Sequence, residues 1–262
     1  MNAPAAISPP LRVTPDLGHA FGGVWRLTFC RFRLPGHWLT VGIGLAVLTL
    51  LFAGGPRRGD TGQFLDWTMG FYVTFLVPAL AFMAAAGAMR DEMKSGTVDY
   101  VLTRPVPRPA FVVFKFIAHT VCTQLDLLLA FGVVIFFTAM HEVPGIAAVA
   151  LKLLFGQVLL VAAFSAFGFL CGAITSRYVV IGLAYAGIVE AGVGQIPTQL
   201  SRLSMTHQVR ELLAILLHRV APHATSPGVM GTTGILLAFT AITLLAAAAI
   251  FTLRELSGPS DT

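Results

Sequence analysis

The amino-acid sequence predicts an all-α, polytopic membrane protein with six transmembrane helices. Hydrophobic residues make up 56% of its 262 residues, and only 11% of the residues are charged. A soluble domain usually carries about 25% charged residues, so most of this chain must face lipid or pack against itself within lipid. The mean hydropathy of +0.81 agrees with this. Apolar segments of about 20 residues, the length that crosses a bilayer, recur along the chain.

The predicted spans alternate with short polar connections. The first and the last span contain no Asp, Glu, Lys or Arg, and the second has Pro78 in its middle. The third and fourth are longer than a bilayer requires, so we expect them to tilt or to extend beyond it. Residues 1–15 are rich in Ala and Pro and are expected to form a disordered tail. One membrane domain, residues 16–262, then holds spans at 34–56, 67–89, 110–140, 146–176, 178–196 and 228–253.

Two further segments are predicted to be helices at the membrane surface. From Asp16 to Arg33, bulky apolar residues recur at helical spacing opposite His19 and Arg26, which is typical of a helix in the cytosolic interface. Between spans five and six, Ser201 to Val220 has a second apolar face, and Pro222 ends the pattern. The apolar faces contain Leu17, Phe21, Val24, Trp25, Phe29 and Phe32 in the first segment and Val209, Leu212, Leu213, Leu216 and Val220 in the second.

Lys and Arg residues are distributed unevenly between the two sides of the predicted spans. Ten fall on one side and five on the other. The richer side is cytosolic under the positive-inside rule, which places both termini in the cytosol. The ten are Arg12, Arg26, Arg31, Arg33, Arg90, Lys94, Arg104, Arg108, Arg177 and Arg254, and the five are Arg57, Arg58, Arg202, Arg210 and Arg219.

Several functional classes lack support in the sequence. There is no G-x-x-x-x-G-K-[ST] loop, so the chain is not expected to bind ATP in that manner, and no catalytic constellation favours an enzyme. The three cysteines form no Cys-x-x-Cys pair, which argues against a zinc site or a disulfide framework. The net charge of +5 fits the flanks of membrane spans rather than a nucleic-acid surface. We therefore expect no bound metal, cofactor or nucleic acid.

Two acidic residues, Asp126 and Glu190, fall within predicted spans. A charged side chain inside the bilayer costs about 2.5 to 3.5 kcal/mol on insertion scales, so each must have a partner or a water-filled path. Each acid therefore either lines a transport path or only fixes packing; for Asp126 the partner would be Lys152, Gln157 or His119. Both interpretations stay open for Asp126. The glycines around Glu190 allow close helix approach, which favours a pathway or dimer-interface role for that residue.

The densest cluster of charge runs from Arg90 to Lys115, between spans two and three. A segment this polar is not expected to cross the bilayer. It is instead held beside the cytosolic surface, where it can receive force from a cytosolic partner. Glu92 and Lys94 can form ion pairs with such a partner, and Gly96 allows close backbone approach.

The same segment follows a recognisable pattern: Arg-x-Glu, three residues, Gly-Thr, then Leu-x-x-Pro, a basic residue, and a Lys in the next span. The residues are Arg90, Glu92, Gly96, Thr97, Leu102, Pro105, Arg108 and Lys115. This pattern resembles that of permeases of the type-2 ABC exporter family, in particular the single-domain permeases of nitrous-oxide-reductase maturation and of bacitracin-type resistance. The six-span layout and the two surface helices are also similar to that family, so the resemblance covers nearly the whole chain.

The resemblance implies a permease of the bacterial cytoplasmic (inner) membrane that forms a homodimer or pairs with a second permease. It also implies two cytosolic ABC ATPase subunits, which would bind the ATP and magnesium. The loop at residues 90–109 would act as the coupling helix that contacts them. Its contact residues would be Arg90, Glu92, Lys94, Gly96, Thr97, Arg104 and Arg108.

A second functional class stays open beside the ATP-driven exporter. A self-sufficient secondary transporter or channel could use Asp126 and Glu190 for ion coupling. Six spans without an evident inverted repeat are few for such a protein, which favours the exporter. An apolar bundle with few polar residues favours a lipid-like, glycolipid or hydrophobic-peptide cargo.

Overall fold

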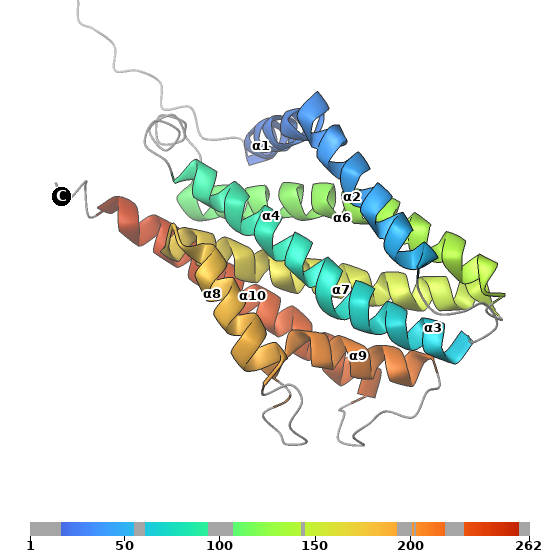
Figure 1. Cartoon of the computed structure of the whole chain (residues 1–262). Coiled ribbons are helices and arrows are strands. Elements are labelled where there is room, and N and C mark those ends of the chain that lie inside the picture. The colour runs from blue at the N-terminus through green and yellow to red at the C-terminus, as the bar shows by residue number, and fades with distance from the viewer. Residues whose placement is uncertain are drawn as a thin grey trace, which may run out of the picture.

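A computed structural model describes residues 17–54, 61–93, 107–142, 145–192, 201, 203–217 and 228–256. The described parts of the chain are helical and contain no strand, which confirms the predicted all-α fold (Figure 1). The helices are α1 (Leu17–Phe32), α2 (Pro35–Ala53), α3 (Thr61–Trp67), η1 (Thr68–Leu76), α4 (Val77–Glu92), α6 (Arg108–Met140), α7 (Ile146–Ile174), α8 (Tyr178–Tyr185), η2 (Ala186–Glu190), α9 (Met205–Leu216) and α10 (Gly228–Leu256).

Five helical segments are long and apolar enough to cross a membrane: Pro35–Ala53, Gly62–Glu92, Arg108–Met140, Ile146–Ile174 and Gly228–Leu253. They coincide with five of the six predicted spans. In place of the predicted span at 178–196, the described residues form a shorter apolar helix, Tyr178–Glu190. At about 1.5 Å per residue this helix covers about 20 Å, less than a hydrocarbon core of about 30 Å. The count of six spans therefore stays a prediction.

The second span contains a proline without being broken by it. Pro78 has no N–H to donate and its ring displaces the carbonyl four residues earlier, so an ordinary α-helix would kink here. The preceding residues Thr68–Leu76 instead form a π-helix, η1, which runs directly into α4. The Thr74 hydroxyl donates to the Met69 carbonyl five residues earlier, at 2.8 Å. The wider π-helical turn keeps α3, η1 and α4 continuous through the membrane.

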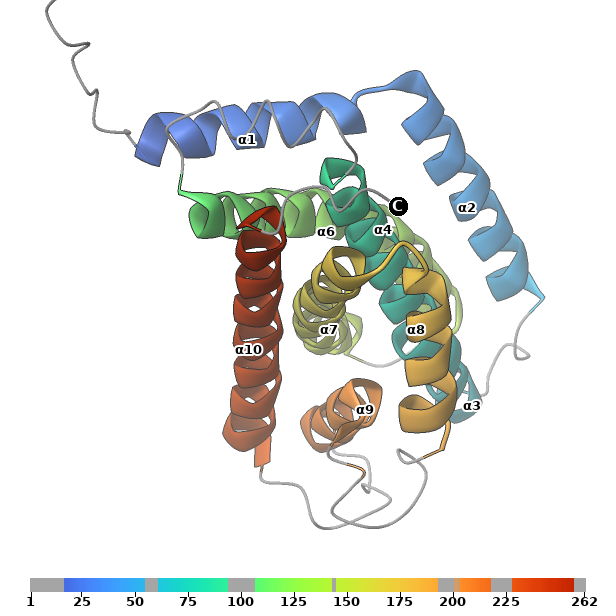
Figure 2. The ribbon, with the colours of Figure 1, turned by 90° about the vertical axis from the view of Figure 1, so that its left-hand side faces the viewer.

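Helix α7 lies in the middle of the bundle, with α4, α6, α9 and α10 around it (Figure 2). Its contact with α4 depends on two glycines four residues apart. A Cβ atom at Gly168 would lie 2.7 Å from the Phe82 carbonyl oxygen, and one at Gly172 would lie 2.5 Å from the Ala86 carbonyl oxygen. Only glycine permits this approach, as in other small-residue contacts between membrane helices.

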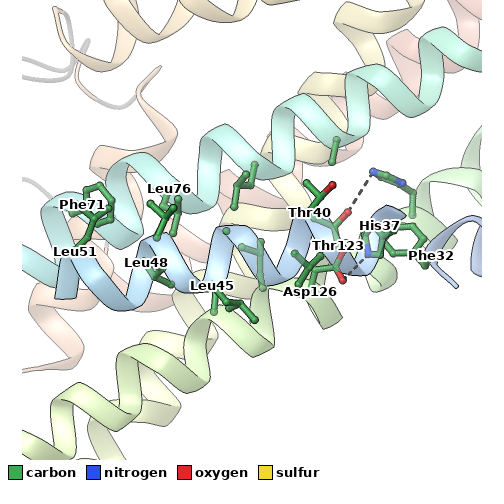
Figure 3. A pocket seen from close by; sticks show the side chains of 18 residues that line it. Phe32, His37, Thr40, Leu45, Leu48, Leu51, Phe71, Leu76, Thr123 and Asp126 are labelled. Carbon is green, nitrogen blue, oxygen red and sulfur yellow. Dashed lines mark hydrogen bonds and ion pairs between the residues drawn. The ribbon is translucent and has the colours of Figure 1, made fainter. Parts of the chain in front are cut away.

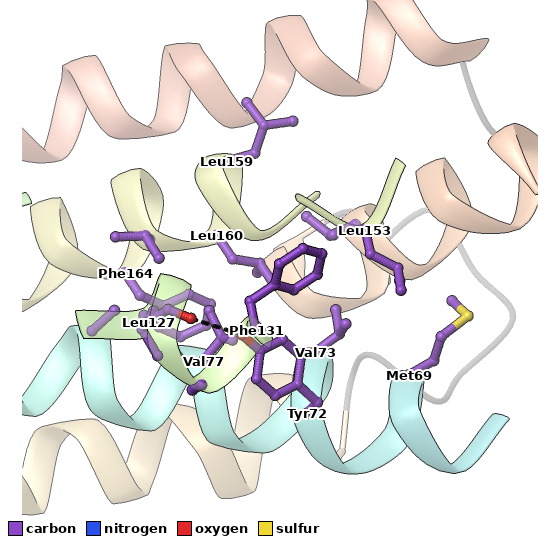
Figure 4. Packing of buried hydrophobic residues seen from close by; sticks show 14 of the residues in the cluster. Met69, Tyr72, Val73, Val77, Leu127, Phe131, Leu153, Leu159, Leu160 and Phe164 are labelled. Atoms are coloured by element: carbon purple, nitrogen blue, oxygen red, sulfur yellow. Dashed lines mark hydrogen bonds between the residues drawn. The ribbon is translucent and has the colours of Figure 1, made fainter. Parts of the chain in front are cut away.

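The larger buried cluster lies between η1, α6 and α7 (Figure 4). Tyr72 is at its centre and is 1% exposed. Its hydroxyl group donates to Gln157 Oε1 at 2.7 Å and lies 3.3 Å from the Leu127 carbonyl oxygen. These contacts satisfy a polar group that would otherwise be costly to bury. The hydroxyl group therefore ties three spans together at one point.

Both predicted surface helices are present. Helix α1 runs across one end of the bundle beside the first part of α6 (Figure 2), where the Phe21 and Phe114 ring centroids lie 5.3 Å apart. Val24 is buried against that end of the bundle. Helix α9 buries Val209 and Leu213 against α7, where Gly156 leaves room for them. The residues of the predicted faces that are buried are Val24 in α1 and Val209, Leu212 and Leu213 in α9, whereas Leu17 is exposed and Val220 lies outside the described residues. The placement of α1 in the membrane interface stays a prediction.

Candidate functional site

The charged segment between α4 and α6 is described only at its two ends. Arg90 and Glu92 belong to the last turn of α4, and Arg108 is the first residue of α6. Both arginines are half-buried. The other predicted contact residues lie outside the described residues: Lys94, Gly96, Thr97 and Arg104.

Glu92 and Lys115 form an ion pair inside the bundle. Lys115 Nζ lies 2.7 Å from Glu92 Oε1, and each side chain is only 1% exposed. Met89, Phe111 and Val112 form the apolar cluster around this level of the bundle. Removing one partner of a buried pair strands a charge and costs about 3–5 kcal/mol, so the two groups hold each other in place. The end of α4 is thereby fastened to the beginning of α6.

This geometry changes the interpretation of Glu92. The sequence analysis expected its carboxylate to face a partner protein, whereas here the carboxylate is buried against Lys115 of the same chain. Glu92 therefore positions the charged segment instead of presenting a charge on it. The available signal was Lys115, a single charge in the apolar third span, together with the acidic residues Asp91 and Glu92 just after the second span. Glu92 and Lys115 both belong to the family pattern, but the sequence did not predict that they form a pair.

Glu190 lies against the first turn of α9. Its carboxylate accepts a hydrogen bond from Met205 N at 3.1 Å and others from the Ser204 hydroxyl and from the backbone and hydroxyl groups of Thr206. The first N–H groups of a helix lack partners within the helix and favour a negative charge. Glu190 thus caps α9 and joins it to η2. This supports the packing interpretation of Glu190 over the pathway interpretation.

Asp126 pairs with a residue near the start of the first span. Its Oδ1 lies 3.1 Å from His37 Nε2, and each side chain keeps about a quarter of its surface exposed. The sequence analysis proposed Lys152, Gln157 or His119 as packing partners and did not consider His37. The helical position of Asp126 shows which face it occupies, but it does not show which helix, 89 residues away in sequence, meets that face.

A cavity of about 600 Å³ opens beside this pair, between α2, α4 with η1, and α6 (Figure 3). Its polar groups gather at one end, where Thr123 Oγ1 lies 3.3 Å from His119 Nε2. The other end is apolar and is lined by leucines of α2 and by Phe71. The cavity therefore has the polarity of an amphipathic molecule. The sequence does not predict this cavity, because the walls of the cavity come from three separate spans.

The comparisons with known proteins agree with the pattern of the charged segment. The sequence matches the family model described as ABC-2 family transporter protein over residues 14–256. The comparison with curated proteins finds no match. The matched region includes every described helix, from α1 to α10. The protein therefore belongs to the ABC-2 transporter family, as a multi-pass transmembrane component of an ABC transporter.

Proposed function

We propose that this chain is the membrane-spanning permease subunit of an ATP-driven exporter. Two permeases, either identical or different, associate in the bacterial cytoplasmic membrane with both termini in the cytosol. Two separate cytosolic ATPase subunits bind ATP and magnesium and drive alternating access of the permease pair. The family supports a membrane component that works with an ATPase. The direction of transport and the composition of the complex are our proposal.

The buried pair between Glu92 and Lys115 carries the coupling part of this proposal. A loop transmits force only if its two ends are held, because a loose loop would absorb the movement of its partner. The ion pair joins the end of α4 to the first part of α6, the two helices that flank the charged segment. A push on this loop therefore acts on both helices at once.

The glycine contact carries the same movement further into the membrane. Helix α4 packs against α7 at backbone distance through Gly168 and Gly172. Packed helices without space between them move together because interiors deform little. Displacement of the charged loop would thus shift α4, α6 and α7 as one unit, which is the movement that alternating access requires.

The alternative, a secondary transporter or channel that uses Asp126 and Glu190, has weaker support. Glu190 is held by the first turn of α9, so its carboxylate serves a helix end. Asp126 and Glu190 both line cavities, of about 600 Å³ and about 180 Å³ respectively, but these cavities share no lining residue. An ion-coupled transporter would move cargo in vesicles without an ATPase and would lose transport when the ion gradient is collapsed. The exporter would need ATP and its partner.

Co-purification with the partner ATPase tests the proposal. The change is Lys94→Glu with Arg104→Glu, compared with Arg57→Glu and Arg58→Glu in a loop predicted on the opposite side. We expect the first pair to reduce the recovered ATPase by about tenfold, equivalent to about 1.4 kcal/mol of binding energy. The control pair should leave recovery unchanged. Equal recovery in both double variants would contradict the proposed contact surface.

A further inference from the structure

The cavity beside Asp126 has a length that suits a hydrocarbon chain. Along α2 its wall extends from His37 to Leu51, which is about 21 Å at 1.5 Å per residue. Its volume of about 600 Å³ lies within the range of about 300–1,000 Å³ for small-molecule sites. Below the polar end, the wall consists of aliphatic side chains and Phe71. A single alkyl chain fits a cavity of this length and composition better than a compact polar molecule does.

The polar end has an anionic group that is only partly matched. Asp126 Oδ1 pairs with His37 Nε2, and about a quarter of the Asp126 side chain remains exposed beside the cavity. A carboxylate can accept about four hydrogen bonds, so it has capacity for a further donor. His37 is itself fixed by the edge of the Phe32 ring, with centroids 4.7 Å apart. A cationic amine offers both hydrogen bonds and a compensating charge, whereas an anionic headgroup would be repelled.

We propose that this cavity is a binding site for a single-chain amphipath with an amine headgroup. The ammonium group lies at Asp126, within reach of His37 and Thr123, and the chain follows α2 toward Leu51. The site is formed within one chain and needs neither ATP nor a second subunit. The inference therefore goes beyond the exporter function, and it can be tested on the permease alone.

A glycine in the wall gives a direct means of filling the cavity. Gly44 lines it, and a Cβ atom at this position meets no other atom within 4 Å. A leucine there would therefore extend into the space that the alkyl chain occupies without displacing the surrounding helices. Gly42 lies two residues earlier, about 200° around the helix, and is equally open but does not line the cavity. Gly42→Leu is therefore a matched control for Gly44→Leu.

Photolabelling of the purified permease in nanodiscs tests the proposal. The probe is hexadecylamine with a photoreactive diazirine in its chain, and the matched probes are the corresponding alcohol and carboxylic acid. We expect the amine to label residues of α2, η1 and α6 at the cavity and unlabelled hexadecylamine to compete. Gly44→Leu should reduce this labelling by about tenfold, whereas Gly42→Leu should not. Asp126→Asn should weaken amine labelling by about tenfold and leave alcohol labelling unchanged, because the neutral amide loses the charge that strengthens the hydrogen bond from the ammonium group.

Each contrary outcome overturns the proposal. Labelling that is unaffected by Gly44→Leu would place the chain outside the cavity. Equal labelling by the acid and the amine would remove the role of Asp126. Labelling at the cavity by none of the three probes, together with a disulfide between two copies that carry Val47→Cys, would show that a second copy occupies this face. Unchanged ATPase recovery in the Lys94 and Arg104 variants would contradict the proposed exporter function and leave the labelling intact, so the two proposals fail separately.

Discussion

At the scale of single residues, two charged groups join α4 to α6 at one end of the bundle. Glu92 and Lys115 neutralise each other where neither is accessible to water. Glu92→Gln or Lys115→Met should each lower the free energy of unfolding by about 3–5 kcal/mol, because each strands one buried charge. Thermal unfolding in detergent measures this. The double variant should lose less than the sum of the single variants, since it strands neither charge.

Lys152→Met is the matched control for the loss of a lysine. Lys152 lies in the first part of α7 and is half-buried without taking part in the ion pair. We expect Lys152→Met to change the unfolding temperature much less than Lys115→Met does. Additive losses in the double variant, or equal losses at both lysines, would show that the pair contributes no specific coupling between α4 and α6.

Glu190 illustrates a residue whose interpretation depends on a neighbouring element. Because its carboxylate caps α9, Glu190→Gln should destabilise the protein by about 1 kcal/mol through weaker capping. Glu142 is exposed and follows the end of α6, so Glu142→Gln serves as the control and should have no such effect. Hydrogen exchange of the α9 amides measures the change. Normal protection of α9 in the Glu190 variant, together with altered transport, would restore the pathway interpretation.

At the scale of elements, the contact between α4 and α7 imposes the strictest requirement on sequence. Gly172→Ala would place a methyl group at the Ala86 carbonyl oxygen and should cost about 1–3 kcal/mol through overpacking. The matched control is Gly132→Ala on α6, where a Cβ atom meets nothing within 4 Å. The control should be neutral or stabilise by up to about 1 kcal/mol. Unfolding temperatures that rank the two variants in the opposite order would contradict this packing.

The sequence was sufficient to predict most helices and the faces they bury. Apolar length located five spans, and helical periodicity located α1 and α9, because these patterns are local. The helix Tyr178–Glu190 is shorter than the predicted span and is followed by a turn at residues 191–192, and residues 193–196 of that span lie outside the described residues. Pro78 lies in the middle of the predicted second span, and the sequence did not predict the π-helix that precedes it. Local sequence patterns thus predict the positions of the helices more accurately than the residues at which the helices begin and end.

The contacts that form the candidate site could not be predicted in the same way. Asp126 meets His37 across 89 residues, and Glu92 meets Lys115 across 23. A pattern along one helix indicates the side on which a charge lies but not the helix that faces it. The family resemblance rests on the charged segment, which lies inside the region that matches the family model, and the coupling role that it implies stays a prediction. It did not distinguish residues that touch a partner from residues that hold the segment in place.

At the scale of the whole molecule, the bundle has a tightly packed part and a loosely packed edge. Helices α4, α6, α9 and α10 are packed around α7, whereas α2 lies at the outside (Figure 2). The outer face of α2 exposes Leu39, Ile43 and Leu50. The proposed movement therefore involves the tightly packed helices α4, α6 and α7. The proposed amphipath site lies between α2 and two of these helices, α4 and α6.

The most direct test of the central claim is a cross-linking measurement on the assembled complex. A photoreactive amino acid replaces Thr97 in the charged segment or, as the control, Arg58 in the loop predicted on the opposite side. If the charged segment contacts the ATPase, we expect an adduct with the ATPase from position 97 and none from position 58. Lys115→Met should reduce the adduct at position 97, because the segment is then no longer held at both ends. An ATPase that co-purifies but cross-links only at position 58, or at neither position, would contradict the proposal that the charged segment contacts the ATPase.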